Sequence, residues 1–120
     1  MEIYEVHLED LPFFSFHGLY PEERILGNSY RMSVSVSKQV SQEIKDDISK
    51  TMDYGLIYQI CAQVMAEPVD LLETVCQQVA EKIQIQYPDY LSIEISLRKE
   101  HPPLGMAGGR SMVRWTVRNE

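Results

Sequence analysis

A lysine occupies a strand position where an apolar residue is expected, in the stretch "SLRKEHPPLGMAGGR" (residues 96–110). The preceding residues of the same parity are all apolar, so Lys99 should point toward the core side of a strand. They are Leu91, Ile93, Ile95 and Leu97. Partial burial disfavours the charged form of an ammonium, which suits proton transfer near neutral pH. The alternative is a lysine whose stem runs along a frayed strand end into solvent.

The loop after Lys99 is rich in proline and glycine. Pro102 and Pro103 stiffen the backbone beside the lysine. Three glycines, Gly105, Gly108 and Gly109, would allow the loop to approach a ligand closely. A glycine-rich loop that binds phosphate normally leads into a helix, and no helical pattern follows here, so the phosphate signal is weak.

A carboxylate precedes an apolar helical pattern in "DLLE" (residues 70–73). Asp70 followed three residues later by Glu73 is typical of a capping box at a helix start. The alternative is that Glu73 faces a flat heterocycle, because a carboxylate accepts paired N–H bonds from an amidine-like edge. The residues alone leave both interpretations open.

Three further residues have side chains suited to acid–base work. Tyr54 in "MDYG" precedes the first expected helix, where it would either pack its ring or offer its hydroxyl to a proton relay. Glu22 and Glu23 in "YPEER" are most simply explained as a solvated turn. The three histidines lack the paired spacing of metal ligands, so we expect no metal site.

The elements that must carry these residues follow from hydrophobic periodicity. Residues 2–8 alternate, and the reversed parity at Leu11, beside Pro12, predicts a bulge or bend. Glycine and proline in "HGLYPEERILGN" (residues 17–28) predict a hairpin connection, and residues 30–38 form the clearest strand. Residues 90–100 and 110–120 alternate again and predict a second hairpin.

Two helices are predicted between the hairpins. The first ends before Pro68, and the second begins with Asp70 as its N-cap. Their apolar stripes are Ile57, Ile60, Cys61 and Val64 in the first, and Leu72, Val75, Cys76, Val79 and Ile83 in the second. The order predicts one α+β domain over residues 1–120, a four-stranded antiparallel sheet (ββααββ) with both helices on one face. The unpaired edges of so small a sheet favour an oligomer.

Composition narrows the functional class. The chain has 120 residues and a formal net charge of −7, which argues against nucleic-acid binding because phosphates require a basic surface. The acidic N-terminus does not resemble a signal peptide, and no apolar run could span a bilayer, so a cytoplasmic location is expected. Cys61 and Cys76 fall on apolar helical positions and are interpreted as reduced core residues.

Four segments together resemble the dihydroneopterin aldolase family, in order and at similar spacing, over residues 3–118. They are "LPFFSFHGLYPEERILGNSY", "TMDYGLIYQI", "VDLLETVCQQVAEKI" and "ISLRKEHPP". The resemblance implies the tunnelling fold, in which small subunits pair their sheets into a barrel as tetramers or octamers, with active sites between subunits. It also implies retro-aldol cleavage of 7,8-dihydroneopterin in folate synthesis, with epimerisation to dihydromonapterin as a second activity in many members.

The resemblance further implies a role for each candidate residue. Glu73 would anchor the pterin ring, and Lys99 would donate to a ring nitrogen and handle protons. Tyr54 of a neighbouring subunit would transfer a proton, and Glu23 would hold the side-chain hydroxyls. The backbone around Leu72 and Met52 would line the pterin slot. His17 matches a family histidine and is interpreted as structural or as supporting the site.

No cofactor is required by this chemistry, because the pterin's own carbon–nitrogen double bond accepts the electrons of the broken bond. The segment "EHPPLGMAGG" after the lysine departs from the family pattern, which leaves substrate preference open. One alternative is a dihydroneopterin triphosphate epimerase, which would use Arg24, Arg110 or Arg114 for the phosphates. Another is a non-catalytic pterin-binding ring module. A zinc-dependent pterin synthase of the same fold is disfavoured by the histidine spacing.

Overall fold

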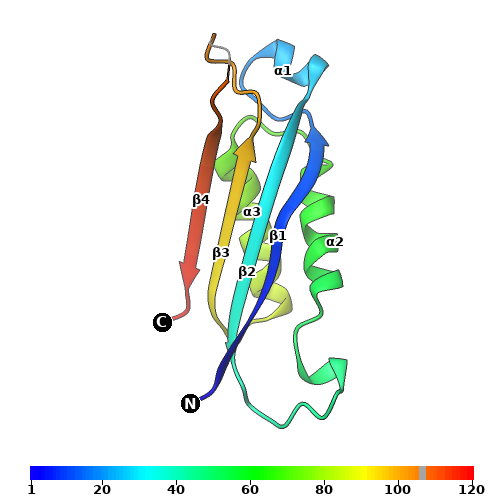
Figure 1. Ribbon diagram of the computed structural model, residues 1–120, viewed down its shortest axis with the longest axis vertical. Coiled ribbons are helices and arrows are strands. Elements are labelled where there is room, and N and C mark those ends of the chain that lie inside the picture. Colours follow the sequence, from blue (N-terminus) through cyan, green and yellow to red (C-terminus); the bar gives the residue numbers. More distant parts are fainter. Residues whose placement is uncertain (106–107) are drawn as a thin grey trace.

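The computed structural model describes residues 1–105 and 108–120, so Met106 and Ala107 of the loop after Lys99 lie outside the described residues. The predicted order, two hairpins flanking two helices, is confirmed (Figure 1). The elements are β1 (Ile3–Ser15), α1 (Pro21–Leu26), β2 (Asn28–Gln39), the 3-10 turn η1 (Ile48–Lys50), α2 (Tyr54–Met65), α3 (Leu72–Gln86), β3 (Tyr90–Lys99) and β4 (Ser111–Arg118).

The four strands form one antiparallel sheet in the order β1-β2-β3-β4. Helices α2 and α3 both cover the same face of this sheet, so the expected α+β arrangement is confirmed (Figure 1). Alternation in β2 and β3 sends one row of side chains under the helices and the other away from them. The buried row comprises Tyr30, Met32, Val34, Val36, Ile93, Ile95 and Leu97.

The predicted bulge is confirmed in β1. Its register with β2 shifts between Leu8 and Leu11, and Asp10 adopts a φ of 57°, which is uncommon for a residue with a Cβ. The Asp10 N–H donates to the Ser33 hydroxyl at 2.9 Å, so a side chain replaces the missing ladder partner. Beyond the bulge, Phe13 faces α2 and lies 6.2 Å from the ring of Tyr58.

The connection between β1 and β2 contains a helix, α1, which the turn residues alone did not predict. Pro21 occupies its first position, where a backbone N–H would have no partner within the helix. Gly27 ends it with a φ of 72°, a conformation that favours glycine. The short helix places Glu23 on the inner side of the connection while Glu22 stays exposed.

The helices bury the residues that the sequence assigned to the core, except Ile60, which is partly buried against it. Cys61 and Cys76 are free and buried, as predicted, and burial raises the pKa of each thiol to about 12. None of the helices among the described residues is long and apolar enough to cross a membrane.

Candidate active site

A pocket of about 250 Å³ lies at the end of the sheet where β3 stops and α3 begins. The α1 connection closes one side of it, and the segment before β4 closes another. Its lining includes Glu23, Leu72, Glu73, Lys99, Pro103 and Val113. Residues from four separate parts of the chain therefore meet in one concave surface, the usual form of a small-molecule site.

Lys99 points to the core side of β3, as the alternation predicted. The residue is 8% exposed, and its Nζ lies 2.5 Å from Oε2 of Glu23. Both side chains are 10% exposed, so this ion pair is largely shielded from solvent. The interpretation of Lys99 as a solvated strand end is therefore wrong. An ammonium and a carboxylate lie together in the pocket and form a short, charge-assisted hydrogen bond.

Glu23 faces inward because the chain around it leaves room for its carboxylate. The interpretation of this residue as part of a solvated turn is wrong. A Cβ on Gly18 would overlap the Glu23 carboxylate, and Gly18 has a φ of 149°. Oε1 of Glu23 also lies 3.4 Å from the Tyr20 N–H. The glycine is needed both for its backbone conformation and for the space above its Cα.

Glu73 lies at the start of α3, but the predicted N-cap at Asp70 is wrong, and so is the capping-box interpretation of Asp70 and Glu73. The N-cap of α3 is Leu71, with no side-chain bond, rather than Asp70. Asp70 instead accepts a hydrogen bond from Arg24 of α1, with Nη2 and Oδ1 2.5 Å apart. The Asp70 carboxylate is therefore bonded to α1, and the start of α3 has no side-chain cap.

The Glu73 carboxylate remains available to a ligand. It is exposed, and no hydrogen bond or ion pair reaches it from any residue that the structure describes. The N-terminal end of a helix favours negative charge, so the position suits an anionic acceptor. Leu72, beside it, is buried and lines the same pocket.

Tyr54 and Met52 are not brought to this pocket by their own chain. The Tyr87 hydroxyl, at the far end of α3, lies 3.1 Å from the Asp53 N–H, so the start of α2 is beside the end of α3. Since α3 has 15 residues, this location is roughly 20 Å from Glu73. Met52 is buried in the core, and Tyr54 is 64% exposed.

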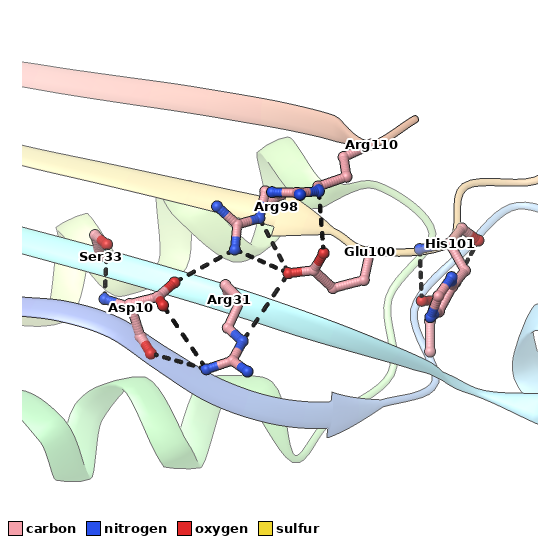
Figure 2. Close-up of polar contacts among 8 residues, drawn as sticks. Asp10, Arg31, Ser33, Arg98, Glu100, His101 and Arg110 are labelled. Atoms are coloured by element: carbon pink, nitrogen blue, oxygen red, sulfur yellow. Dashed lines mark hydrogen bonds and ion pairs between the residues drawn. The ribbon is translucent and has the colours of Figure 1, made fainter. Parts of the chain in front are cut away.

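The end of β3 is braced from the helix-free face of the sheet (Figure 2). Glu100 follows Lys99 and points the opposite way, where Oε1 lies 2.9 Å from Arg98 Nη2 and Oε2 lies 3.5 Å from Arg110 Nε. Arg31 reaches both Asp10 of the bulge, at 3.8 Å, and Glu100, at 3.9 Å. A hydrogen bond from Arg98, with the neighbouring guanidinium charges, holds the pKa of Glu100 below its usual range. This network ties β1, β2 and β3 together directly behind Lys99.

His17 is a site-adjacent residue whose contacts the sequence did not reveal. It is 1% exposed, and its Nδ1 accepts the Val69 N–H at 3.1 Å. Burial, together with the charges of Arg24 and Lys99, lowers the pKa of His17 to about 4, so the imidazole is neutral near neutral pH. The histidine-before-glycine motif was the available signal, but it did not indicate which group the side chain contacts.

The arrangement suits a flat polar ligand. Glu73 offers two acceptor oxygens on one side of the pocket, and Lys99 with Glu23 offers a donor and an acceptor on another. Among the described residues, no group of three His, Cys, Asp or Glu side chains forms a candidate metal site. Such a pocket can orient a heterocycle and exchange protons with it.

The chain is similar to known proteins in sequence and in fold. The family model of dihydroneopterin aldolase (FolB) matches residues 6–116. A curated relative, dihydroneopterin aldolase of Bacillus subtilis (strain 168), is 26% identical over 102 residues, covering 83% of this chain and 85% of the relative.

Two solved structures share the fold. Dihydroneopterin aldolase of Escherichia coli, in complex with neopterin, has a TM-score of 0.73 and 18% identity, covering 96% of this chain and 99% of that chain. Dihydroneopterin aldolase of a Burkholderia species, bound to guanine, has a TM-score of 0.75 and 15% identity, covering 98% of this chain and 93% of that chain. The expectation that the chain has the fold of these enzymes, the tunnelling fold, is confirmed.

Proposed function

The chain belongs to the dihydroneopterin aldolase family, and we propose that the pocket between α1, α3 and the end of β3 is its active site. The observation that carries this proposal is the convergence of Glu23, Glu73 and Lys99 on one cavity from three distant parts of the chain. Two of these residues form a shielded ion pair, and the third leaves its carboxylate open.

The chain is a lyase of folate synthesis that cleaves 7,8-dihydroneopterin into 6-hydroxymethyl-7,8-dihydropterin and glycolaldehyde. In this retro-aldol reaction, the hydroxyl on the second side-chain carbon loses its proton and becomes the aldehyde of glycolaldehyde. The bond between the first and second carbons breaks, and its electron pair passes into the ring carbon–nitrogen double bond as an enamine. Protonation of the first carbon then gives the hydroxymethyl product. The protein must therefore hold the ring and move two protons.

Glu73 is proposed to bind the ring. Its two oxygens accept from the exocyclic amine and the adjacent ring N–H of the pterin, a paired arrangement that a carboxylate matches in shape. Neopterin and guanine, the ligands of the two structural neighbours, share this amino–carbonyl pyrimidine edge. The position at the start of α3 supports the role, because the helix end stabilises the carboxylate that the ring requires.

Lys99 and Glu23 are proposed to handle protons and hydroxyls. The Lys99 ammonium donates to the ring nitrogen that gains electron density during cleavage, which stabilises the enamine. Glu23 accepts hydrogen bonds from the side-chain hydroxyls, in place of part of its bond to Lys99. The 2.5 Å contact between the two supports this role, because it holds both groups at the same place before substrate binds.

Tyr54 is proposed to act from a neighbouring copy of the chain, with the backbone around Met52 lining the pterin slot beside it. Its exposure and its distance from the pocket of its own chain support this. In the described sheet, β1 and β4 each pair on one side only, so copies can join edge to edge into a tetramer or octamer. The active site would then lie between subunits.

The location of the arginines favours the unphosphorylated substrate over a triphosphate. Arg24 is occupied by Asp70, at 2.5 Å. Arg110 and Arg114 pair with Glu100 and Glu94. A triphosphate would require several unpaired guanidinium or ammonium groups beside the pocket, and each of these three arginines already has a carboxylate partner.

The direct test is incubation with 7,8-dihydroneopterin, followed by chromatography and an assay for glycolaldehyde. We expect 6-hydroxymethyl-7,8-dihydropterin and an equal amount of glycolaldehyde, with dihydromonapterin as a second product by epimerisation. Pterin binding without glycolaldehyde release would support the non-catalytic alternative and overturn the proposal. Turnover only of the triphosphate would support the epimerase alternative.

A mixing experiment tests the shared site. Tyr54→Ala and Lys99→Ala should each be nearly inactive, but unfolding and refolding them together should regenerate intact sites. Random assembly gives about a quarter of the wild-type sites if each site draws Lys99 and Tyr54 from two neighbouring copies. No recovery in mixed oligomers would show that Tyr54 does not complete the site of a neighbour.

A further inference from the structure

His17 lies beside the pocket without lining it, and its polar contacts are unequal. Nδ1 accepts the Val69 N–H at 3.1 Å, whereas Nε2 is buried with no partner among the described residues. A neutral imidazole that accepts at Nδ1 carries its hydrogen on Nε2. Among the described residues, the one side-chain hydrogen bond of His17 is therefore its bond to the backbone of Val69.

Val69 is held at both of its peptide groups by the same dipeptide. Its C=O accepts the Gly18 N–H at 2.9 Å, while its N–H donates to His17. Val69 lies four residues before Glu73, in the segment that leads directly into α3. The two bonds that His17 and Gly18 make to Val69 therefore anchor the segment that leads to Glu73.

The same dipeptide contacts the opposite side of the pocket. The Tyr30 hydroxyl donates to the His17 C=O at 3.1 Å, and Tyr30 is the register partner of Lys99 across β2 and β3. Lys99 Nζ also lies 6.0 Å from the centre of the Tyr30 ring. The Cα of Gly18 faces the Glu23 carboxylate. The dipeptide thus joins the segment that carries Glu73 to the groups that surround Lys99.

We propose that His17 is a positioning residue: through Nδ1 it fixes the segment before α3, and so sets the distance between Glu73 and the Glu23–Lys99 pair. This inference rests on the proposed function. Removal of the acceptor would release Val69 and allow the start of α3 to move. The hydrogen bonds from the pterin ring to Glu73 would then weaken. Because the Glu23–Lys99 pair has its own contacts, we expect a larger effect on pterin binding than on the rate of the chemical step.

Two substitutions separate the Nδ1 bond from the bulk of the side chain. In asparagine, Oδ1 is attached to Cγ as Nδ1 is in histidine, so His17→Asn keeps an acceptor for Val69. His17→Leu fills the space and has no acceptor. We expect the KM for 7,8-dihydroneopterin to rise about tenfold in His17→Leu, with kcat changed by less than about twofold. His17→Asn should restore the KM to within about twofold of wild type.

Amide hydrogen exchange provides a readout that does not require catalysis. The Val69 N–H should exchange faster in His17→Leu than in wild type or His17→Asn, because only the leucine variant lacks its acceptor. An equal rise in KM in both variants would overturn the proposal, as would unchanged KM and Val69 exchange in His17→Leu. If the wild type releases no glycolaldehyde, the proposed function fails. The hydrogen bond between His17 and Val69 is still tested by the exchange rate of the Val69 N–H.

Discussion

Acid should destabilise this protein through His17, by an amount that follows from its burial. The pKa of His17 is lowered from 6.5 to about 4, chiefly by burial and further by the charges of Arg24 and Lys99. Below pH 6.5 the unfolded chain binds a proton at His17 that the folded chain does not. The free energy of unfolding therefore falls as the pH drops from 6.5 to 4. Above pH 6.5 both states hold a neutral imidazole and the contribution vanishes.

The difference between 6.5 and about 4 sets the size of the effect. At about 1.36 kcal/mol for each pKa unit, the complete loss below pH 4 is about 3 kcal/mol. About 2 kcal/mol of this should already be lost at pH 5. Because native domains are stable by only about 5–15 kcal/mol, an effect of this size is readily measured.

Urea unfolding of wild type and His17→Asn, at one fixed protein concentration, measures the effect. Asparagine does not titrate, so the difference in unfolding free energy between the two proteins should shrink by about 2 kcal/mol between pH 7.5 and pH 5. His101→Asn is the matched control, because it removes an exposed histidine. A difference that stays constant over this range would refute the reasoning, since it would mean that His17 accepts a proton equally in both states.

Three further substitutions test the site. Lys99→Ala should lower kcat by about 10²-fold while pterin affinity, measured by calorimetry, largely survives; an equal loss of both would assign Lys99 to ring anchoring instead. Glu73→Ala should weaken pterin binding by about 2 kcal/mol in the same titration. Glu22 is exposed, so Glu22→Ala is the control and should leave the pterin affinity unchanged. Gly18→Ala should push the Glu23 carboxylate off Lys99, and we expect kcat to fall. The same substitution should lower the free energy of unfolding by about 1 kcal/mol. Unaltered kcat in Gly18→Ala would show that the Glu23 position does not matter to catalysis.

The fold was largely predictable because its signals are local. Alternation in β2 and β3 has a period of two, so the parity of each residue indicated which face it occupies, and the buried row agrees with that reading. The parity change at Leu11 likewise predicted the bulge that the register confirms. Helix α1 was missed because proline and glycine mark both a turn and the two ends of a short helix.

The candidate site was predictable only in part. Lys99 was expected to face the core because strand parity requires it, and it does. The predicted cap at Asp70 was wrong: its carboxylate pairs with Arg24, 46 residues away, and the N-cap of α3 is Leu71. His17 gave no local sign of its partner, since Val69 is separated from it by 52 residues.

The amino-acid sequence by itself determined the order of elements, the buried faces and the direction in which Lys99 points, because periodicity acts between neighbours in the chain. Only the tertiary structure decided that Glu23, 76 residues from Lys99, would turn inward to pair with it and that Glu73 would open onto the same pocket. Those contacts depend on how the sheet, α1 and α3 pack together. That packing is a balance of burial and charge over the whole fold, which no local spacing of residues encodes.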